Sequence, residues 1–196
     1  YTIYLFCGNL LFNYYREATS NGMNSLMSNS RIFSKINVPK YIFLLSRNVT
    51  SLINFGLTLI VFFIFCIVDR VEFGIHFLAL IYPISCLVIF NLGIGLILSA
   101  LFVFFRDMSY LYDIFTMLLM YLSAIFYTVD IMPEKYQTMF LLNPVYVYIK
   151  YFRTVVLDGQ VPSFELHLLG AFYAFMAILV GAWIYKKYNY KFLYYV

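Results

Sequence analysis

Few residues in this 196-residue chain are of types that do chemistry, and they are scattered rather than grouped. His76 and His167 each stand alone, and Cys7, Cys66 and Cys86 lie in apolar segments without a CxxC spacing. The sequence has no phosphate-binding glycine loop, no cluster of metal ligands and no nucleophile paired with a base. We therefore predict no catalytic residue, no metal and no cofactor in this chain. Energy for any uphill work would come from another chain or from an ion gradient.

The composition is that of a membrane protein. Hydrophobic residues make up 64% of the chain and charged residues 11%, and the mean hydropathy is +0.85. A soluble domain carries about 25% charged and 45–50% apolar residues. The net charge of +4 says little by itself about nucleic acid, and we expect no nucleic-acid partner.

Several apolar runs are long enough to cross a bilayer, which takes about 20 residues in a helix. We predict spans at residues 41–68, 83–104, 108–129 and 166–185. Residues 1–15 resemble the end of a further span, so we expect the sequence to be truncated at its N-terminus. None of these runs alternates with period two, which argues against a barrel. The predicted fold is an all-α polytopic transmembrane bundle.

The distribution of lysine and arginine predicts the orientation through the positive-inside rule. If residues 16–40 form a cytoplasmic loop, alternation of the spans places most cations inside. The inside set is Arg16, Arg31, Lys35, Lys40, Arg47, Arg106, Lys186, Lys187 and Lys191, and the outside set is Arg70, Lys135, Lys150 and Arg153. Residues 130–157 then begin and end at the outer face.

The segment 130–157 contains two apolar pieces, 136–142 and 145–151, that are too short to cross. Pro144 lacks an N–H and biases Asn143 away from helical geometry, so the chain must turn between them. The Asn143 amide is placed to donate to carbonyls left unpaired at the turn. We predict a re-entrant outer gate of two short helices. The alternative is a hydrophobic loop lying flat in the outer headgroups.

The polar segment 16–40 has helical character, with Met23, Leu26 and Met27 on one stripe. A polar helix that joins two spans on the cytoplasmic side suits the docking of a soluble partner. The alternative is an interfacial helix with no partner.

Two features inside predicted spans bear on packing and transport. Asn91, Gly95 and Ser99 are spaced four apart and form a stripe of small residues that predicts close helix packing. Asp113 lies within a span, where an ionisable residue is a candidate for transport. It could instead snorkel to the interface or pair with Arg106.

Aromatic residues make up 22% of the chain and many lie near predicted helix ends. Interfacial belts explain most of them. Sugars also stack on aromatic faces, so some could line a path for a glycan. The candidates are Tyr121, Phe126, Tyr127, Tyr146 and Tyr148.

Three segments together resemble the permease subunits of type 2 ABC exporters, in the branch that handles O-antigen, teichoic acid and capsular polymers. They are "NSLMSNSRIFSKINVPKYIFLLSRNVTSLINF", "GIGLILSALFVFFRDMSYL" and "SAIFY…MPEK…LLNPVYVYIKYFR". Val38 stands where that family usually has an aromatic residue, and Ala124 where it usually has proline.

The resemblance implies the membrane subunit of an ATP-driven exporter of a lipid-linked polysaccharide or teichoic acid, in the cytoplasmic membrane of a bacterium. It implies two partners: a nucleotide-binding ATPase subunit, which would hold ATP and Mg²⁺, and a second permease copy. Together with the helical stripe, it predicts ATPase coupling through Met23, Leu26, Met27, Arg31, Lys35 and Pro39. It predicts a cytoplasmic turn at Arg106 and Asp107, and a gate at Pro133, Asn143 and Pro144.

Three other functions stay open on the sequence. An exporter of a drug or small lipid would share the scaffold. An ion-coupled flippase would need ionisable residues in mid-membrane, and only Asp113 approaches that position. A purely structural membrane protein would not need a re-entrant segment.

Overall fold

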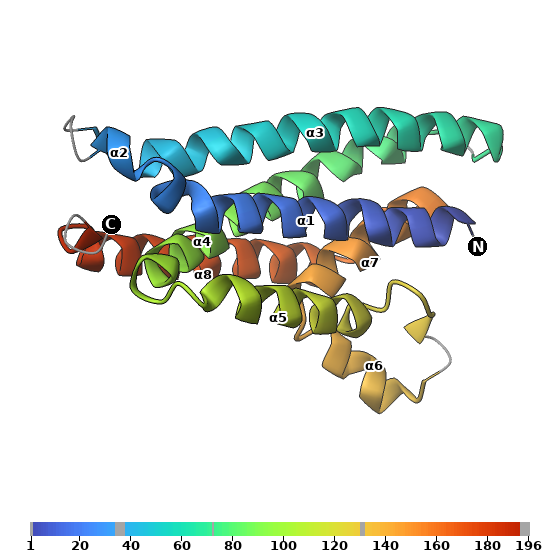
Figure 1. Ribbon diagram of the computed structural model, residues 1–196. Coiled ribbons are helices and arrows are strands. Elements are labelled where there is room, and N and C mark those ends of the chain that lie inside the picture. The colour runs from blue at the N-terminus through green and yellow to red at the C-terminus, as the bar shows by residue number, and fades with distance from the viewer. Residues whose placement is uncertain (1, 34–37, 72, 130–131, 193–196) are drawn as a thin grey trace.

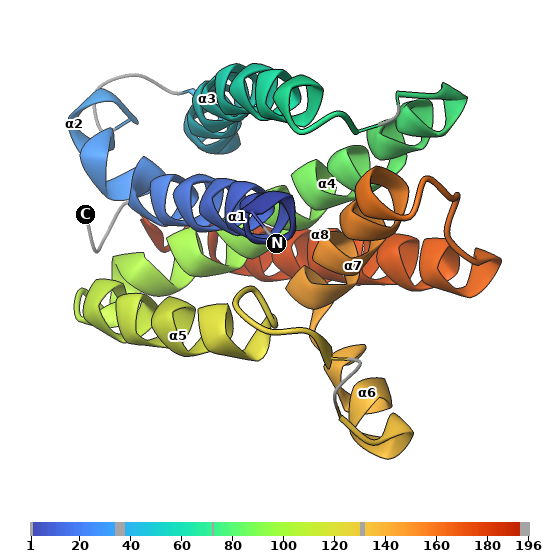
Figure 2. The ribbon, with the colours of Figure 1, turned by 90° about the vertical axis from the view of Figure 1, so that its right-hand side faces the viewer.

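The computed structural model describes residues 2–33, 38–71, 73–129 and 132–192, and every regular element in these ranges is helical. The all-α prediction is therefore confirmed. Most helices lie side by side in one bundle, while α6 projects away from it (Figures 1 and 2). The elements are α1 Thr2–Ser28, α2 Ser30–Phe33, α3 Tyr41–Val68, the 3₁₀ helix η1 Ile75–Leu80, α4 Ile81–Phe104, α5 Met108–Leu122, α6 Glu134–Phe140, α7 Pro144–Leu157 and α8 Phe164–Tyr188.

Within the described ranges, three helical segments are long and apolar enough to cross a membrane: Tyr41–Val68, Ile75–Phe104 and Phe164–Tyr188. They coincide with three of the four predicted spans. A helix can cross a bilayer because its backbone groups are hydrogen-bonded within the segment. With several such segments, the chain is a multi-pass membrane protein.

The fourth predicted span, 108–129, is too long. Helix α5 ends at Leu122. The Ser123 hydroxyl donates to the Leu119 carbonyl at 2.7 Å, and Ala124 takes a positive φ of 49°. A residue in this left-handed region cannot continue a right-handed helix, so the chain turns here.

The predicted boundary between a span ending at residue 15 and a polar, roughly helical segment from residue 16 coincides with no break in the helix. Helix α1 runs without a break from Thr2 to Ser28, and its side chains are buried well past that boundary. The reason is that helix α1 has one buried face and one exposed face. Tyr15, Ala18 and Gly22 pack into the bundle, while the charged Arg16 is exposed on the other side.

Close packing of α1 and α8 against α4 depends on glycines. A Cβ on Gly93 would lie 2.4 Å from the backbone of Ala177, and one on Gly181 would lie 2.4 Å from the Gly93 carbonyl. On the other side of α4, a Cβ on Gly22 would lie 3.1 Å from the Cα of Gly95. The predicted packing of small residues therefore occurs at Gly95, and glycine at these crossings brings the helix backbones together.

Candidate functional site

The Asn143 side chain joins the end of α5 to the start of α7. Its Oδ1 accepts from the backbone N–H groups of Val145 at 3.0 Å and Tyr146 at 3.4 Å, which caps α7. Its Nδ2 donates to the Ser123 hydroxyl at 3.0 Å and to the Leu122 carbonyl at 3.3 Å. One amide thus satisfies orphan groups at two helix ends, as capping requires.

The other two predicted gate residues shape the same segment. Pro144 is the first residue of α7, where its missing N–H costs no helical bond. Pro133 precedes α6, and its carbonyl accepts from the N–H of Tyr136 at 2.8 Å. The two short helices and the turn between them are present as expected. Their insertion into the outer leaflet stays a prediction.

Arg153, on α7, is buried to 6% exposure beneath the turn that follows α5. Its guanidinium donates to the carbonyls of Ala124 at 2.9 Å and Ile125 at 3.1 Å, and its Nε donates to the Tyr4 carbonyl at 3.3 Å. The outer-side position expected for Arg153 from the cation count stays a prediction, but the side chain is buried in the bundle rather than solvent-exposed. A buried guanidinium is stable only when its donors are satisfied, and here three backbone oxygens supply the acceptors.

The start of α1 completes this cluster, which we call the Arg153 clamp: Tyr4, Gly8, Ala124, Ile125 and Arg153. The guanidinium carbon lies 3.5 Å from the centroid of the Tyr4 ring, a cation–π contact. The Tyr4 hydroxyl donates to the carbonyl of Tyr127 at 2.7 Å. A Cβ on Gly8 would lie 2.6 Å from the guanidinium, so the clamp requires glycine there.

The five aromatic candidates for the substrate path divide into two groups. Tyr146 and Tyr148 are buried, and the Tyr148 hydroxyl donates to the Gly170 carbonyl at 2.8 Å. These two belong to the core rather than to a path, because helix α7 packs against α1 and α8. Tyr121 and Phe126 are exposed, with ring centroids 6.1 Å apart, and the Tyr127 hydroxyl donates to the Tyr121 carbonyl at 2.9 Å.

A groove of about 440 Å³, with largely apolar walls and a row of polar side chains, runs between α1 and α3. On α1 it is lined by Asn9, Asn13 and Glu17, at helical spacing, and on α3 by Asn54 and Thr58. The Asn54 amide donates to the Glu17 carboxylate at 2.7 Å. Because Asn54 lies near the middle of the spanning helix α3, the carboxylate lies at the depth of a membrane-crossing segment.

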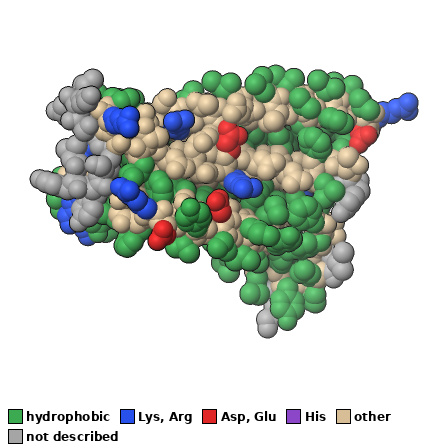
Figure 3. Space-filling view, viewed as in Figure 1, with side chains coloured by type: hydrophobic (Ala, Val, Ile, Leu, Met, Phe, Trp, Pro, Cys, Tyr) green, Lys and Arg blue, Asp and Glu red, His purple; other side chains and the backbone are tan. Residues whose placement is uncertain are grey.

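A second set of polar side chains lies where α1 meets α5. The Tyr112 hydroxyl, on α5, donates to the Thr19 hydroxyl on α1 at 2.5 Å. Arg16 and Asp113, each within one turn of this bond, are exposed. In the space-filling view, acidic and basic side chains lie over α1 and α5, between apolar surfaces of α3 and of the α5–α6 region (Figure 3).

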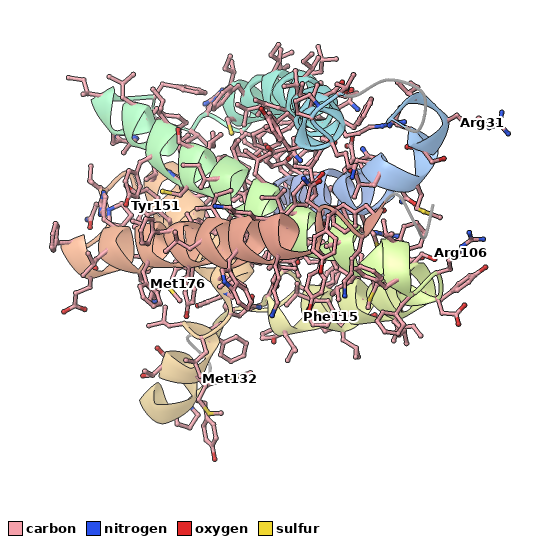
Figure 4. All side chains as sticks on the ribbon, turned by 90° about the vertical axis from the view of Figure 1, so that its left-hand side faces the viewer. Arg31, Arg106, Phe115, Met132, Tyr151 and Met176 are labelled. Atoms are coloured by element: carbon pink, nitrogen blue, oxygen red, sulfur yellow. The ribbon has the colours of Figure 1, made fainter. Side chains whose placement is uncertain are left out.

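The predicted coupling residues do not form one surface. Met23 and Leu26 were predicted to contact the ATPase, but they are buried in the bundle, because α1 packs against α3 and α4. Met27 is half-buried, and Arg31 and Pro39 are exposed. Lys35 lies outside the described residues. Arg31 projects from the same end of the bundle as Arg106 (Figure 4), where Arg106 and Asp107 form the turn before α5.

Sequence reasoning missed Tyr4, Gly8 and Glu17. The polar period of four through Asn9, Asn13 and Glu17 was available as a signal for a polar helix face. The clamp left no such signal, because its residues come together only in three dimensions.

Comparison with known proteins gives a consistent result. A family model described as ABC-2 type transporter matches residues 2–157. Two relatives from Klebsiella pneumoniae, each called O-antigen export system permease protein RfbA, are 29% and 27% identical over 194 residues. Each match covers 98% of this chain and 74% of the relative.

Proposed function

Because the chain belongs to the ABC-2 type transporter family, we propose that it is the membrane subunit of an ATP-driven polysaccharide exporter. The cargo would be a lipid-linked polysaccharide or teichoic acid, carried out across the cytoplasmic membrane of a bacterium. The names of the two relatives, which are permeases of O-antigen export, support this cargo class.

The observation that carries the proposal is the polar face of α1. Asn9, Asn13 and Glu17 line a groove beside the spanning helix α3. Ionisable groups at membrane depth almost always face a bundle interior or a water-filled cavity and mark substrate paths. Amide and carboxylate groups suit a sugar polymer, because sugar hydroxyls both donate and accept hydrogen bonds. The exposed rings of Tyr121 and Phe126 offer stacking surfaces near the C-terminal end of α5.

We assign the two partners to different surfaces. The ATPase, which would bind ATP and Mg²⁺, would dock at the end of the bundle that carries α2, with Arg31 and Pro39 exposed there. A second permease copy would cover α5, whose outward face exposes Ile114, Phe115 and Leu118. Large exposed apolar surfaces of this kind commonly mark lipid or protein contacts.

The test is polymer display in a strain that lacks its own permease and receives this chain with its cognate ATPase. Display, normalised to the amount of assembled complex, should require the P-loop lysine of the ATPase. It should fall in Asn13→Leu and Glu17→Leu, because both remove polar groups from the groove. Asn24→Leu is the matched control, since Asn24 is exposed and lies outside the groove.

Undiminished display from both groove variants would contradict the assignment of the path. Display that persists with an inactive ATPase and is abolished by Glu17→Gln would instead favour an ion-coupled flippase.

A further inference from the structure

A second groove, of about 420 Å³, lies between the start of α3 and the end of α8. Its walls are apolar, and its polar residues all belong to the segments where α3 begins and α8 ends. The walls are Leu44, Leu45, Leu92, Leu96, Ile178 and Ala182. The polar end holds Lys40, Tyr185, Lys186 and Asn189. We call it the α3–α8 groove.

The polar end of the α3–α8 groove favours the binding of an anion. It contains two lysines and no acidic side chain. The first turn of α3 has no side-chain cap. The N–H groups of Ile42 and Phe43 donate to the carbonyls of Pro39 and Lys40, and the positive end of the helix dipole favours anions. The C-terminal dipole of α8 opposes an anion, and Lys186 in its last turn offsets that effect.

Two further observations concern polar residues that line this groove. Tyr185 is 7% exposed, and its hydroxyl has no hydrogen-bond partner among the described residues. Buried hydroxyls without a partner are uncommon in folded proteins. Burial lowers the pKa of Lys40, which means that its charge is partly desolvated, and a nearby anion would favour the charged form.

The α3–α8 groove lies at the basic end of the bundle. Arg31 and Arg106 project from this end (Figure 4), and Lys187 and Lys191 follow in the last turns of the chain. By the positive-inside rule this end is cytoplasmic. Anionic phospholipids of the cytoplasmic leaflet give that surface a negative potential, and basic pockets between spanning helices bind their headgroups.

From these observations we propose that the α3–α8 groove binds an anionic phospholipid of the cytoplasmic leaflet. An acyl chain lies along the apolar walls. The phosphate lies between Lys40 and Lys186. The Lys40 ammonium also donates to the Asn189 carbonyl at 2.7 Å, so the same lysine joins α3 to α8 beside the lipid headgroup.

This site is separate from the groove between α1 and α3, because the two share no lining residue. It is also independent of the cargo. Failure of the proposed export function would leave the lipid site in place, and failure of lipid binding would leave the export function untouched.

Tryptophan quenching by brominated lipids tests the proposal on the full chain in vesicles. The chain has one tryptophan, Trp183, so Trp183→Phe gives a clean background. Leu45→Trp then places a reporter at the groove, where residue 45 is 43% exposed and tolerates a larger ring. Val180→Trp, at an exposed position on α8 outside the α3–α8 groove, is the reporter control.

Brominated phosphatidylglycerol should quench the residue-45 reporter in preference to brominated phosphatidylcholine, and the residue-180 reporter should show a smaller preference. Lys40→Gln and Lys186→Gln should each lower the preference at residue 45 by about fivefold, the effect of one basic residue near an anionic surface. Lys187→Gln is the matched charge control. It removes the next cation on α8, which faces the Trp183 ring at 4.9 Å and does not line the groove.

Three results would overturn the proposal. The first is equal quenching by the two lipids at residue 45. The second is a loss in Lys187→Gln as large as that in Lys186→Gln, which would indicate general surface charge. The third is displacement of phosphatidylglycerol by an equal amount of a polyprenyl phosphate, which would assign the groove to a glycan carrier lipid.

Discussion

Arg153 donates a hydrogen bond of 2.9 Å to the carbonyl of Ala124, the residue whose φ is 49°. A buried guanidinium on α7 thus holds the backbone of the turn after α5 in a conformation that residues with a Cβ rarely adopt. Such residues persist where the surrounding structure over-determines them, often at functional sites. The turn, α7 and the start of α1 therefore act as one unit at this end of the bundle.

The positive φ makes residue 124 sensitive to the size of its side chain. Ala124→Gly should raise the free energy of unfolding by roughly 0.5 kcal/mol, because relief of about 1–2 kcal/mol of strain exceeds the entropy cost of glycine of about 0.5–1 kcal/mol. Ala124→Val should lower it, since β-branched residues tolerate this region least. Thermal unfolding of the purified chain in detergent measures both. Equal midpoints for the glycine and valine variants would show that the turn is not strained.

Gly8→Ala should destabilise the protein through the Arg153 clamp. The added Cβ would lie 2.6 Å from the guanidinium and 3.2 Å from Ile125, and overpacking of this kind costs about 1–3 kcal/mol. Gly56→Ala is the matched control, because a Cβ there meets no atom within 4 Å. The thermal midpoint should fall for Gly8→Ala and hold or rise for Gly56→Ala, as helix propensity favours alanine. A fall of the same size in both would remove the clamp as the cause.

Substitutions of Asn143 separate its two roles. Asn143→Asp keeps the oxygen that caps α7 and loses the donor to Leu122 and Ser123, whereas Asn143→Leu loses both. Loss of the cap alone costs about 1 kcal/mol. Polymer display per assembled complex should therefore decrease from wild type to aspartate to leucine. Gln160→Leu, in an exposed loop, should display normally.

Pro144→Ala offers a second change at the same hinge. Restoring an N–H and freeing Asn143 should let α6 and α7 merge into a straighter helix, with a loss of display but not of complex assembly. Normal display from both Asn143→Leu and Pro144→Ala would mean that the segment is only a loop at the membrane surface.

Cysteine labelling tests the orientation. The native cysteines, Cys7, Cys66 and Cys86, are buried, and a background without them gives the cleanest reading. Single cysteines at Ser28 and Asn189 should resist a membrane-impermeant thiol reagent in intact cells, whereas one at Gln160 should react. All three positions are exposed, so accessibility within the fold does not decide the result. Strong labelling at Ser28 would reverse the topology.

Local signals in the sequence were enough for the main elements. A long apolar run predicted α3, and the dipeptide Asn143-Pro144 predicted the turn before α7, because proline restricts its own backbone and that of its neighbour. The order and spacing of three short motifs predicted the permease class, which the family match over residues 2–157 confirms.

The remaining features depend on contacts between distant segments. Arg16 and Glu17 suggested that a span had ended, yet α1 continues past them, with Arg16 exposed and Glu17 accepting a hydrogen bond from Asn54 on another helix. Arg153 was counted as a cation on the outer side, and its burial against backbone carbonyls from two other segments was not predicted. No pattern within one segment predicts that Glu17 meets Asn54 in the groove between α1 and α3. None predicts that Arg153 meets the backbone carbonyls of its clamp.

Transfer of a lipid-linked glycan into sealed proteoliposomes tests the central claim most directly. The vesicles would contain this chain and its ATPase, with the nucleotide added on the ATPase side. Transfer should require hydrolysable ATP and an intact P-loop lysine, and it should proceed without an ion gradient. Transfer that is driven by an imposed ion gradient, and that is unchanged when ATP is omitted, would contradict the claim.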